Sequence, residues 1–151
     1  MKRPPTPEQV FAQLDHVWQS ARGARAMPAR TEINPVQAGA ALHYAALLDV
    51  VPGPPVDFRY RLLGQHTIES YGLNFTGESH VGHFGHTPER PVFAALVRCV
   101  EARTPQEASG EFQNHNGTPC RARVRAWPLS DDGQTVTGLL AACVFLDAEV
   151  A

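Results

Sequence analysis

Residues 139–146 read Leu-Leu-Ala-Ala-Cys-Val-Phe-Leu, an uninterrupted apolar run near the end of the chain. Successive side chains of a β-strand point to opposite faces, so a strand here presents an apolar surface on both sides. Such a strand is typical of the centre of a sheet that is covered on both faces. We therefore expect the last strand, residues 134–146, to lie in the middle of a layered α+β domain.

Two further strands are predicted directly before this run, at residues 106–113 and 120–129. The segments between the strands, 114–117 and 131–133, are rich in Asn, Asp and Gly, which are turn-forming residues. The last third of the chain is therefore expected to form three antiparallel strands in series.

Arginines occupy alternate positions of the middle one of these strands. Arg121, Arg123 and Arg125 share one face, so they either recruit an acidic partner or pair with carboxylates on neighbouring strands, such as Glu107 and Glu111. Opposite charges on adjacent strands commonly pair across a sheet, so we favour the second interpretation.

The first half of the chain contains a predicted hairpin. Residues 45–51 form a buried strand, a Pro-Gly-Pro-Pro turn follows, and residues 57–63 alternate between apolar and polar. In the second strand, Phe58, Tyr60 and Leu62 are expected to face the core.

The N-terminal helix has clear start signals. Thr6 can cap it, Pro7 suits its first position, and Gln9 completes a capping box; Gly23 ends it. Its wide apolar stripe must pack on the chain's own sheet or on a second subunit, and we predict that it forms a homodimer interface. The candidate interface residues are Val10, Phe11, Leu14, Val17 and Trp18.

Two more helical segments are expected between the strands. A short helix covers residues 35 to about 44. A longer one begins at Thr87-Pro88, a cap followed by proline, and runs to about Arg103. Residues 64–85 contain several glycines and are expected to form short helical turns and loops.

Several short motifs accompany this order of elements. They are Trp18 with Arg22-Gly23, Met27-Pro28-Ala29-Arg30, Ile33-Asn34-Pro35, the sequence FRYRLLG at 58–64 and the sequence YGLNFTG at 71–77. In these motifs the chain resembles a family of free-standing, single-PAS-domain proteins from alphaproteobacteria. The resemblance implies a five-stranded antiparallel sheet of order 2-1-5-4-3 with helices on one face. It assigns residues 26–151 to the PAS-like domain and residues 1–25 to an N-terminal amphipathic helix that caps it or mediates dimerisation.

The resemblance also implies a sensory or regulatory role without catalysis. Output is then expected through contact with an unidentified signalling protein, with or without a small molecule in a pocket between the sheet and the helical middle. No Gly-x-Ser-x-Gly motif or glycine-rich phosphate loop follows a strand, so we do not expect an enzyme. The candidate pocket residues are Phe58, Tyr60, Ile68, Tyr71, Phe75, Leu96 and Val124.

Composition sets broader limits on partners and location. The 151 residues carry a formal net charge of −2, which gives no electrostatic reason to expect a nucleic acid or an anionic membrane as partner. No apolar run approaches the length of a membrane span or a signal peptide. The three cysteines have no metal-binding or disulfide spacing, so a cytoplasmic location is expected.

A histidine cluster provides an alternative function. His80, His83 and His86 recur at intervals of three, and imidazole nitrogens bind metals and haem. A haem- or metal-binding sensor is therefore the second hypothesis, although we favour solvated loop histidines because the segment is rich in glycine. A flavin photosensor is disfavoured, since no cysteine precedes Cys99, and no cofactor is required by the sequence.

Overall fold

The computed structural model describes residues 3–146; residues 1–2 and 147–151, which the predicted domain bounds include, lie outside the described residues. The helices are α1 (Pro7–Arg22), η1 (Arg30–Glu32), α2 (Pro35–Ala38), η2 (Gly39–Tyr44), α3 (Gln65–Tyr71), α4 (His80–Phe84) and α5 (Pro91–Ala102), of which η1 and η2 are 3₁₀ helices. The strands are β1 (Ala45–Val51), β2 (Asp57–Leu63), β3 (Gln106–Gln113), β4 (Pro119–Leu129) and β5 (Gly138–Leu146). Within the described part of the chain, no helix is long and apolar enough to cross a bilayer.

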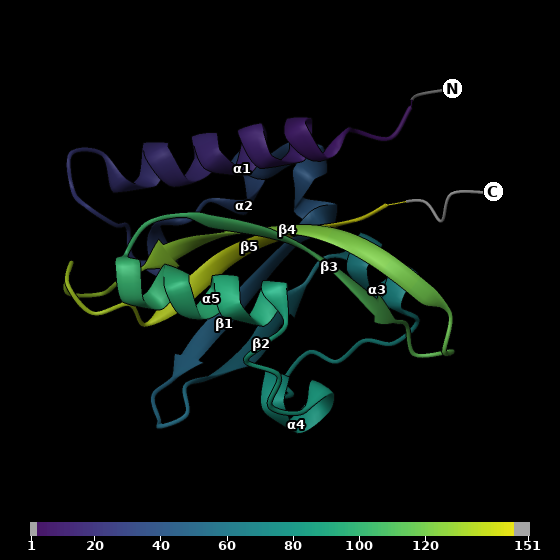
Figure 1. The fold of residues 1–151 in the computed structure, drawn as a ribbon. Helices are drawn as coiled ribbons and strands as arrows, with labels where there is room; N and C mark the ends of the chain where they lie inside the picture. The colour runs from purple at the N-terminus through teal and green to yellow at the C-terminus, as the bar shows by residue number, and fades with distance from the viewer. Residues whose placement is uncertain (1–2, 147–151) are drawn as a thin grey trace.

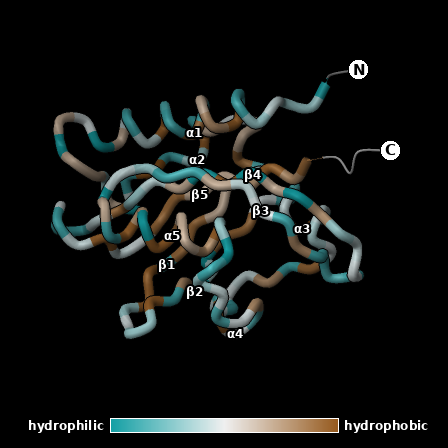
Figure 2. Tube along the Cα trace, viewed as in Figure 1, coloured by the Kyte–Doolittle hydropathy of each residue, from teal (hydrophilic) through white to brown (hydrophobic). Residues whose placement is uncertain are grey.

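The five strands form one antiparallel sheet in the order β2-β1-β5-β4-β3. This confirms the predicted order and the central position of the last strand, which pairs with β1 on one side and β4 on the other. Helix α1 covers one face of the sheet, whereas α3, α4 and α5 lie on the other (Figure 1). Hydrophobic residues concentrate in the central strands between these layers (Figure 2).

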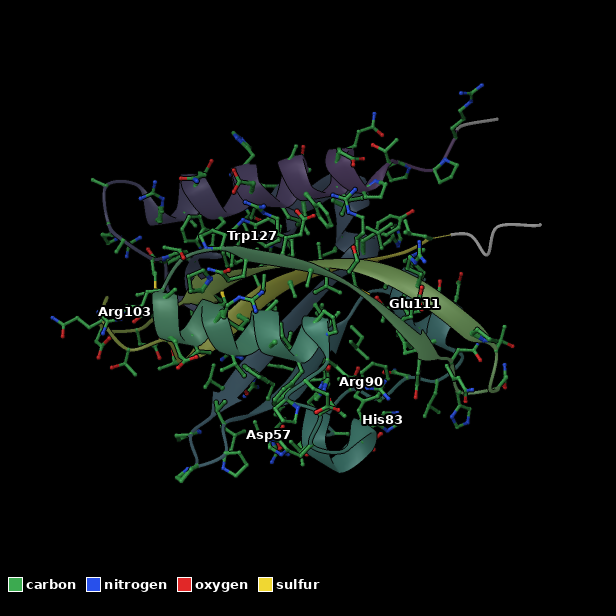
Figure 3. All side chains as sticks on the ribbon, in the orientation of Figure 1. Asp57, His83, Arg90, Arg103, Glu111 and Trp127 are labelled. Atoms are coloured by element: carbon green, nitrogen blue, oxygen red, sulfur yellow. The ribbon has the colours of Figure 1, made fainter. Side chains whose placement is uncertain are left out.

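Helix α1 begins as predicted, with Thr6 and Gln9 forming a reciprocal capping box. Two indole groups then bind it to the sheet. Trp18 Nε1 donates to the Pro128 carbonyl at 2.9 Å, and Trp127 Nε1 donates to Asp15 Oδ1 at 2.9 Å. Trp127 is fully buried between α1 and the sheet (Figure 3). The helix is therefore an integral layer of the fold.

This packing contradicts the assignment of the α1 stripe to a homodimer interface. The stripe faces β4 and β5 of its own chain, and each of its five side chains is at most 6% exposed. A second subunit cannot reach them while α1 stays in place. The affected residues are Val10, Phe11, Leu14, Val17 and Trp18.

Two predicted boundaries are wrong, each for a local reason. Helix α5 begins at Pro91 and not at Thr87, because proline restricts the preceding residue, Arg90, to an extended backbone (φ −80°, ψ 134°). Strand β5 begins at Gly138 and not at residue 134. The Asp132 carboxylate accepts hydrogen bonds from the two backbone N–H groups at 134 and 135, which holds this segment in a turn.

A β-bulge in β2 changes which side chains face the interior. Leu47 of β1 lies opposite Leu62, but Leu48 lies opposite Tyr60, so Arg61 is an extra residue in β2. The alternation shifts by one after the bulge. Leu62, which was expected in the core, is 38% exposed, and Leu63 faces the interior instead.

The arginines of β4 pair with carboxylates, as favoured from the sequence. Arg121 bonds Glu111 at 2.6 Å, and Glu107 accepts from both Arg123 and Arg125 at 2.9 and 3.5 Å. Arg123 also pairs with Glu8 of α1, so three carboxylates, two of them in the sheet, balance the three guanidinium charges. Such surface pairs stabilise the fold little.

Candidate functional site

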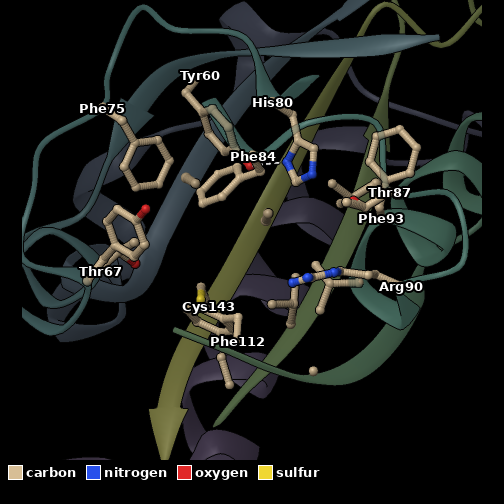
Figure 4. A pocket seen from close by; sticks show the side chains of 18 of the residues that line it. Tyr60, Thr67, Phe75, His80, Phe84, Thr87, Arg90, Phe93, Phe112 and Cys143 are labelled. Carbon is tan, nitrogen blue, oxygen red and sulfur yellow. Dashed lines mark hydrogen bonds between the residues drawn. The ribbon is translucent and has the colours of Figure 1, made fainter. Parts of the chain in front are cut away.

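A cavity of about 610 Å³ lies between the inner face of the sheet and helices α3, α4 and α5 (Figure 4). Small residues form its floor: Ala46, Ala122, Ala141 and Gly110, from four different strands. Ala46 lies directly opposite Ala141, and Gly110 lies opposite Ala122. The space exists because these strands present small side chains to the interior where cores normally carry Leu, Ile or Val.

Five of the seven predicted pocket residues line this cavity: Tyr60, Tyr71, Phe75, Leu96 and Val124. Phe58 is fully buried outside the lining and packs edge-on against Phe93, with the ring centroids 5.9 Å apart. Ile68 does not line the cavity either. Thr67 takes its place because it lies one helical turn before Tyr71 and shares the inner face of α3.

One wall of the cavity comes from a continuous segment that sequence reasoning did not assign to the pocket, residues 80–93. Its lining side chains include His80, Phe84, Thr87, Arg90 and Phe93. The helical spacing of the Phe93 and Leu96 side chains could have revealed part of this wall. The position of His80 and Arg90 depends on how α4 and the following turn fold over β2 and β3, which no local pattern indicates.

His80 is a buried structural histidine and not a solvated loop residue. It is 8% exposed, it begins α4, and its ring stacks on that of Phe93 with the centroids 4.9 Å apart. Its Nδ1 lies 2.7 Å from the Tyr60 hydroxyl. Burial lowers the pKa of His80 to about 4, and burial raises the pKa of Tyr60. At neutral pH the His80 imidazole is therefore neutral, and its tautomer sets the direction of the hydrogen bond between Nδ1 and the Tyr60 hydroxyl.

The other two histidines of the predicted cluster have separate surroundings. His83 Nε2 lies 2.9 Å from the Tyr71 hydroxyl, and its ring stacks on Phe75 at 5.1 Å between centroids. His86 contacts the edge of Phe93 at 5.9 Å. Among residues 3–146, no group of three or more His, Cys, Asp or Glu side chains is placed to hold a metal ion.

Two polar groups, the Thr67 hydroxyl and the Cys143 thiol, lie close to each other at the end of the cavity near α3. Thr67 is 5% exposed, and its hydroxyl oxygen has no hydrogen-bond partner within the described residues. The nearby Cys143 thiol on β5 is neutral, because burial raises its pKa to about 12 despite the stabilising effect of Thr67 on the thiolate. A buried hydroxyl without a partner is unfavourable, so a ligand that supplies one would be stabilised there.

The lining as a whole suits binding better than reaction. Aromatic and aliphatic side chains make up most of it, with a few separated polar groups, which is the usual composition of a small-molecule site. The nucleophile in the wall, Cys143, is protonated, and Nδ1 of His80 is hydrogen-bonded to Tyr60. The volume also falls within the range of about 300–1,000 Å³ that is typical for such sites.

Comparisons with known proteins place this geometry among related folds. A family model described as the PAS domain matches residues 6–142. No curated protein sequence matches the chain.

Solved structures with the same fold are distant in sequence. The Rhodobacter sphaeroides LOV protein superimposes with a TM-score of 0.56 at 11% identity, covering 96% of this chain and 71% of that one. The LOV domain of the blue-light photoreceptor Aureochrome1 gives a TM-score of 0.54 at 10% identity, with 72% and 84% covered. A PAS domain from Colwellia psychrerythraea gives 0.52 at 10% identity, with 74% and 95% covered. At these identities the likeness shows the shared fold alone.

Proposed function

This chain belongs to the PAS domain family, and from this we propose that it is a non-catalytic sensory or regulatory module that binds a small molecule. The observation that carries the proposal is the cavity between the sheet and α3, α4 and α5, with its apolar lining and its separated polar groups. A protein interior is normally packed to crystal-like density, so a space of this size lowers stability while it is empty, and a bound ligand would offset that cost. The signal would pass to another protein by contact.

The wall at residues 80–93 could transmit ligand binding in the cavity to the protein surface. Its inner side chains, such as His80 and Phe93, contact the cavity, while His86 and Glu89 in the same segment are exposed and do not line it. A bound ligand would order this segment and thereby change the surface that a partner meets. Hydrogen exchange should therefore slow at residues 80–93 on ligand binding. Unchanged exchange there, with a ligand demonstrably bound, would rule out this route.

Native mass spectrometry of the purified protein tests ligand binding directly. We expect a fraction of the protein to carry the additional mass of a small molecule that the cavity can enclose. This mass is far below that of a second protein chain. The same spectrum reports the number of chains in each assembly. Screening for thermal stabilisation by small apolar metabolites would extend the search if the protein purifies without a ligand, because binding to the folded state raises its stability.

A matched pair of substitutions tests whether the cavity is open. Ala141 and Ala142 are adjacent on β5, but Ala141 lines the cavity, whereas Ala142 is fully buried on the face that packs against α1. Ala141→Leu should change the free energy of unfolding by less than about 1 kcal/mol, because the added atoms enter empty space. Ala142→Leu overpacks a filled layer and should cost about 1–3 kcal/mol. Urea titration measures both values.

The same pair links the cavity to binding. Ala141→Leu should abolish binding of any ligand found by mass spectrometry, because the new side chain occupies its site. Equal destabilisation by the two substitutions would mean that the inner layer is filled in solution, and the proposal would then fail.

A further inference from the structure

We propose that the ligand is a monocarboxylate with an apolar body, and that Arg90 binds its carboxylate at the mouth of the cavity. This inference rests on the proposed function and names the ligand class of the same site. It is drawn from the arrangement of charged and polar groups around an otherwise apolar space.

Arg90 lies where the wall meets the mouth of the cavity. It is the residue that precedes α5, and its side chain extends from the start of that helix into the cavity (Figure 4). Val92, two residues further, stands directly over Gly110, since a Cβ at position 110 would come within 2.9 Å of it. Arg90 thus lies at the mouth of the cavity, where it lines the pocket and is also exposed to solvent.

The Arg90 guanidinium has no hydrogen bond or ion pair within the described residues, in contrast to the arginines of β4. Glu111 also lines the cavity, but its carboxylate pairs with Arg121 at 2.6 Å and not with Arg90. A guanidinium against an apolar cavity is best stabilised by an anion, and its planar donors match a carboxylate in a bidentate pair.

The start of α5 adds to this preference. No side chain caps its N-terminus, so the N–H groups of Val92 and Phe93 lack a side-chain acceptor. The positive end of the helix dipole also favours a negative group at this position. A carboxylate bound to Arg90 would therefore meet donors from both the side chain and the helix.

The charge of the cavity indicates a single negative charge on the ligand. Arg90 is the one permanently charged cation among the described lining residues. His80 is neutral at physiological pH because burial lowers its pKa to about 4. A carboxylate balances one guanidinium, whereas a phosphate dianion would bring an unbalanced charge against an apolar wall.

The other residues that line the cavity favour an apolar ligand between its two polar ends. Phe84, Phe93, Leu96, Phe112 and Val124 provide an apolar surface between the two polar ends. Thr67 and Arg90 lie on opposite sides of this space (Figure 4). A hydroxyl at the end of the ligand distant from its carboxylate would satisfy the unpaired Thr67 oxygen. An apolar acid with a terminal hydroxyl therefore fits best.

Isothermal titration of the full chain with dodecanoate, ω-hydroxydodecanoate and dodecanol, each below its micelle concentration, tests this inference. Dodecanoate should bind, and Arg90→Gln should weaken its binding by roughly 10- to 100-fold, the effect of losing a charge-assisted pair. Arg98→Gln, on an exposed position of α5, should leave it unchanged. Dodecanol should bind more weakly and be insensitive to Arg90→Gln.

A comparison of the two acids tests whether Thr67 binds a hydroxyl at the far end of the ligand. ω-Hydroxydodecanoate should bind more tightly than dodecanoate by about fivefold to tenfold, the value of one neutral hydrogen bond. Thr67→Val should remove this difference without loss of thermal stability, because it removes a buried hydroxyl that has no partner. Circular dichroism confirms that each variant is folded.

The outcomes separate this inference from the proposed function. Binding that Ala141→Leu abolishes but Arg90→Gln does not affect would overturn the carboxylate assignment and leave the cavity function standing. Binding that neither substitution affects would overturn both. No binding of either acid to the wild-type protein would also overturn the assignment of ligand class.

Discussion

Replacing Leu14 with alanine is expected to lower the free energy of unfolding by about 2–5 kcal/mol, the usual cost of deleting a buried leucine side chain. Leu14 is 1% exposed at the centre of the α1 stripe, where it packs against the sheet of its own chain. The destabilisation should be the same at every protein concentration, because the lost contacts are intramolecular. Urea denaturation at several protein concentrations measures this.

His16→Ala provides the control on the same helix. His16 is exposed and should change the free energy of unfolding by no more than about 0.5 kcal/mol. If the stripe were instead an interface between subunits, Leu14→Ala would yield a stable monomer, and the unfolding midpoint of the wild type would rise with protein concentration. That result would contradict the packing described here.

Acidification is expected to destabilise the wild-type protein between about pH 6.5 and pH 4 through His80. Burial lowers the pKa of this histidine from 6.5 to about 4, so in this interval the unfolded chain binds a proton that the folded chain does not. Stability therefore falls as the pH decreases through the interval. The full contribution is on the order of 3 kcal/mol. A nearby carboxylate, Asp57, opposes the shift, and His83 reinforces it.

His80→Asn isolates this effect. The asparagine side chain retains an acceptor for the Tyr60 hydroxyl but does not titrate, so its stability should change less with pH over the same interval. His86→Asn, on an exposed histidine, should retain the wild-type pH dependence. The carboxyl groups of Glu32 and Asp132, whose pKa values are lowered to about 2, lose their contribution mainly at lower pH. Equal slopes for wild type and His80→Asn would show that folding does not lower the pKa of His80.

Both predictions depend on contacts between segments that are distant in the sequence. Local sequence patterns do not indicate such contacts, although they do indicate other features of the fold. The apolar run at 139–146 correctly predicted a central strand, because a strand needs cover on both faces if both are apolar. The capping box at Thr6 and Gln9 correctly predicted where α1 begins, since those bonds lie within four residues.

Local competition explains the errors of boundary. Pro91 keeps the backbone of Arg90 extended, so α5 starts after Arg90 despite the cap signal at Thr87. Hydrogen bonds from the backbone to the Asp132 side chain hold residues 134 and 135 in a turn, so β5 starts later than predicted. The bulge at Arg61 is different, because it reflects pairing with β1 and has no distinct signal in β2 itself.

The sequence by itself determined the layered α+β sheet and, through family resemblance, the strand order. It also identified three of the seven Phe and Tyr residues that line the cavity. The tertiary structure decided that α1 covers its own sheet, that Thr67 and Arg90 face the cavity, and that His80 is buried and neutral. The physical reason is that periodicity reports which face of an element is apolar, whereas the partner of that face is chosen by packing. Burial and charge pairing at a given residue follow only from that choice.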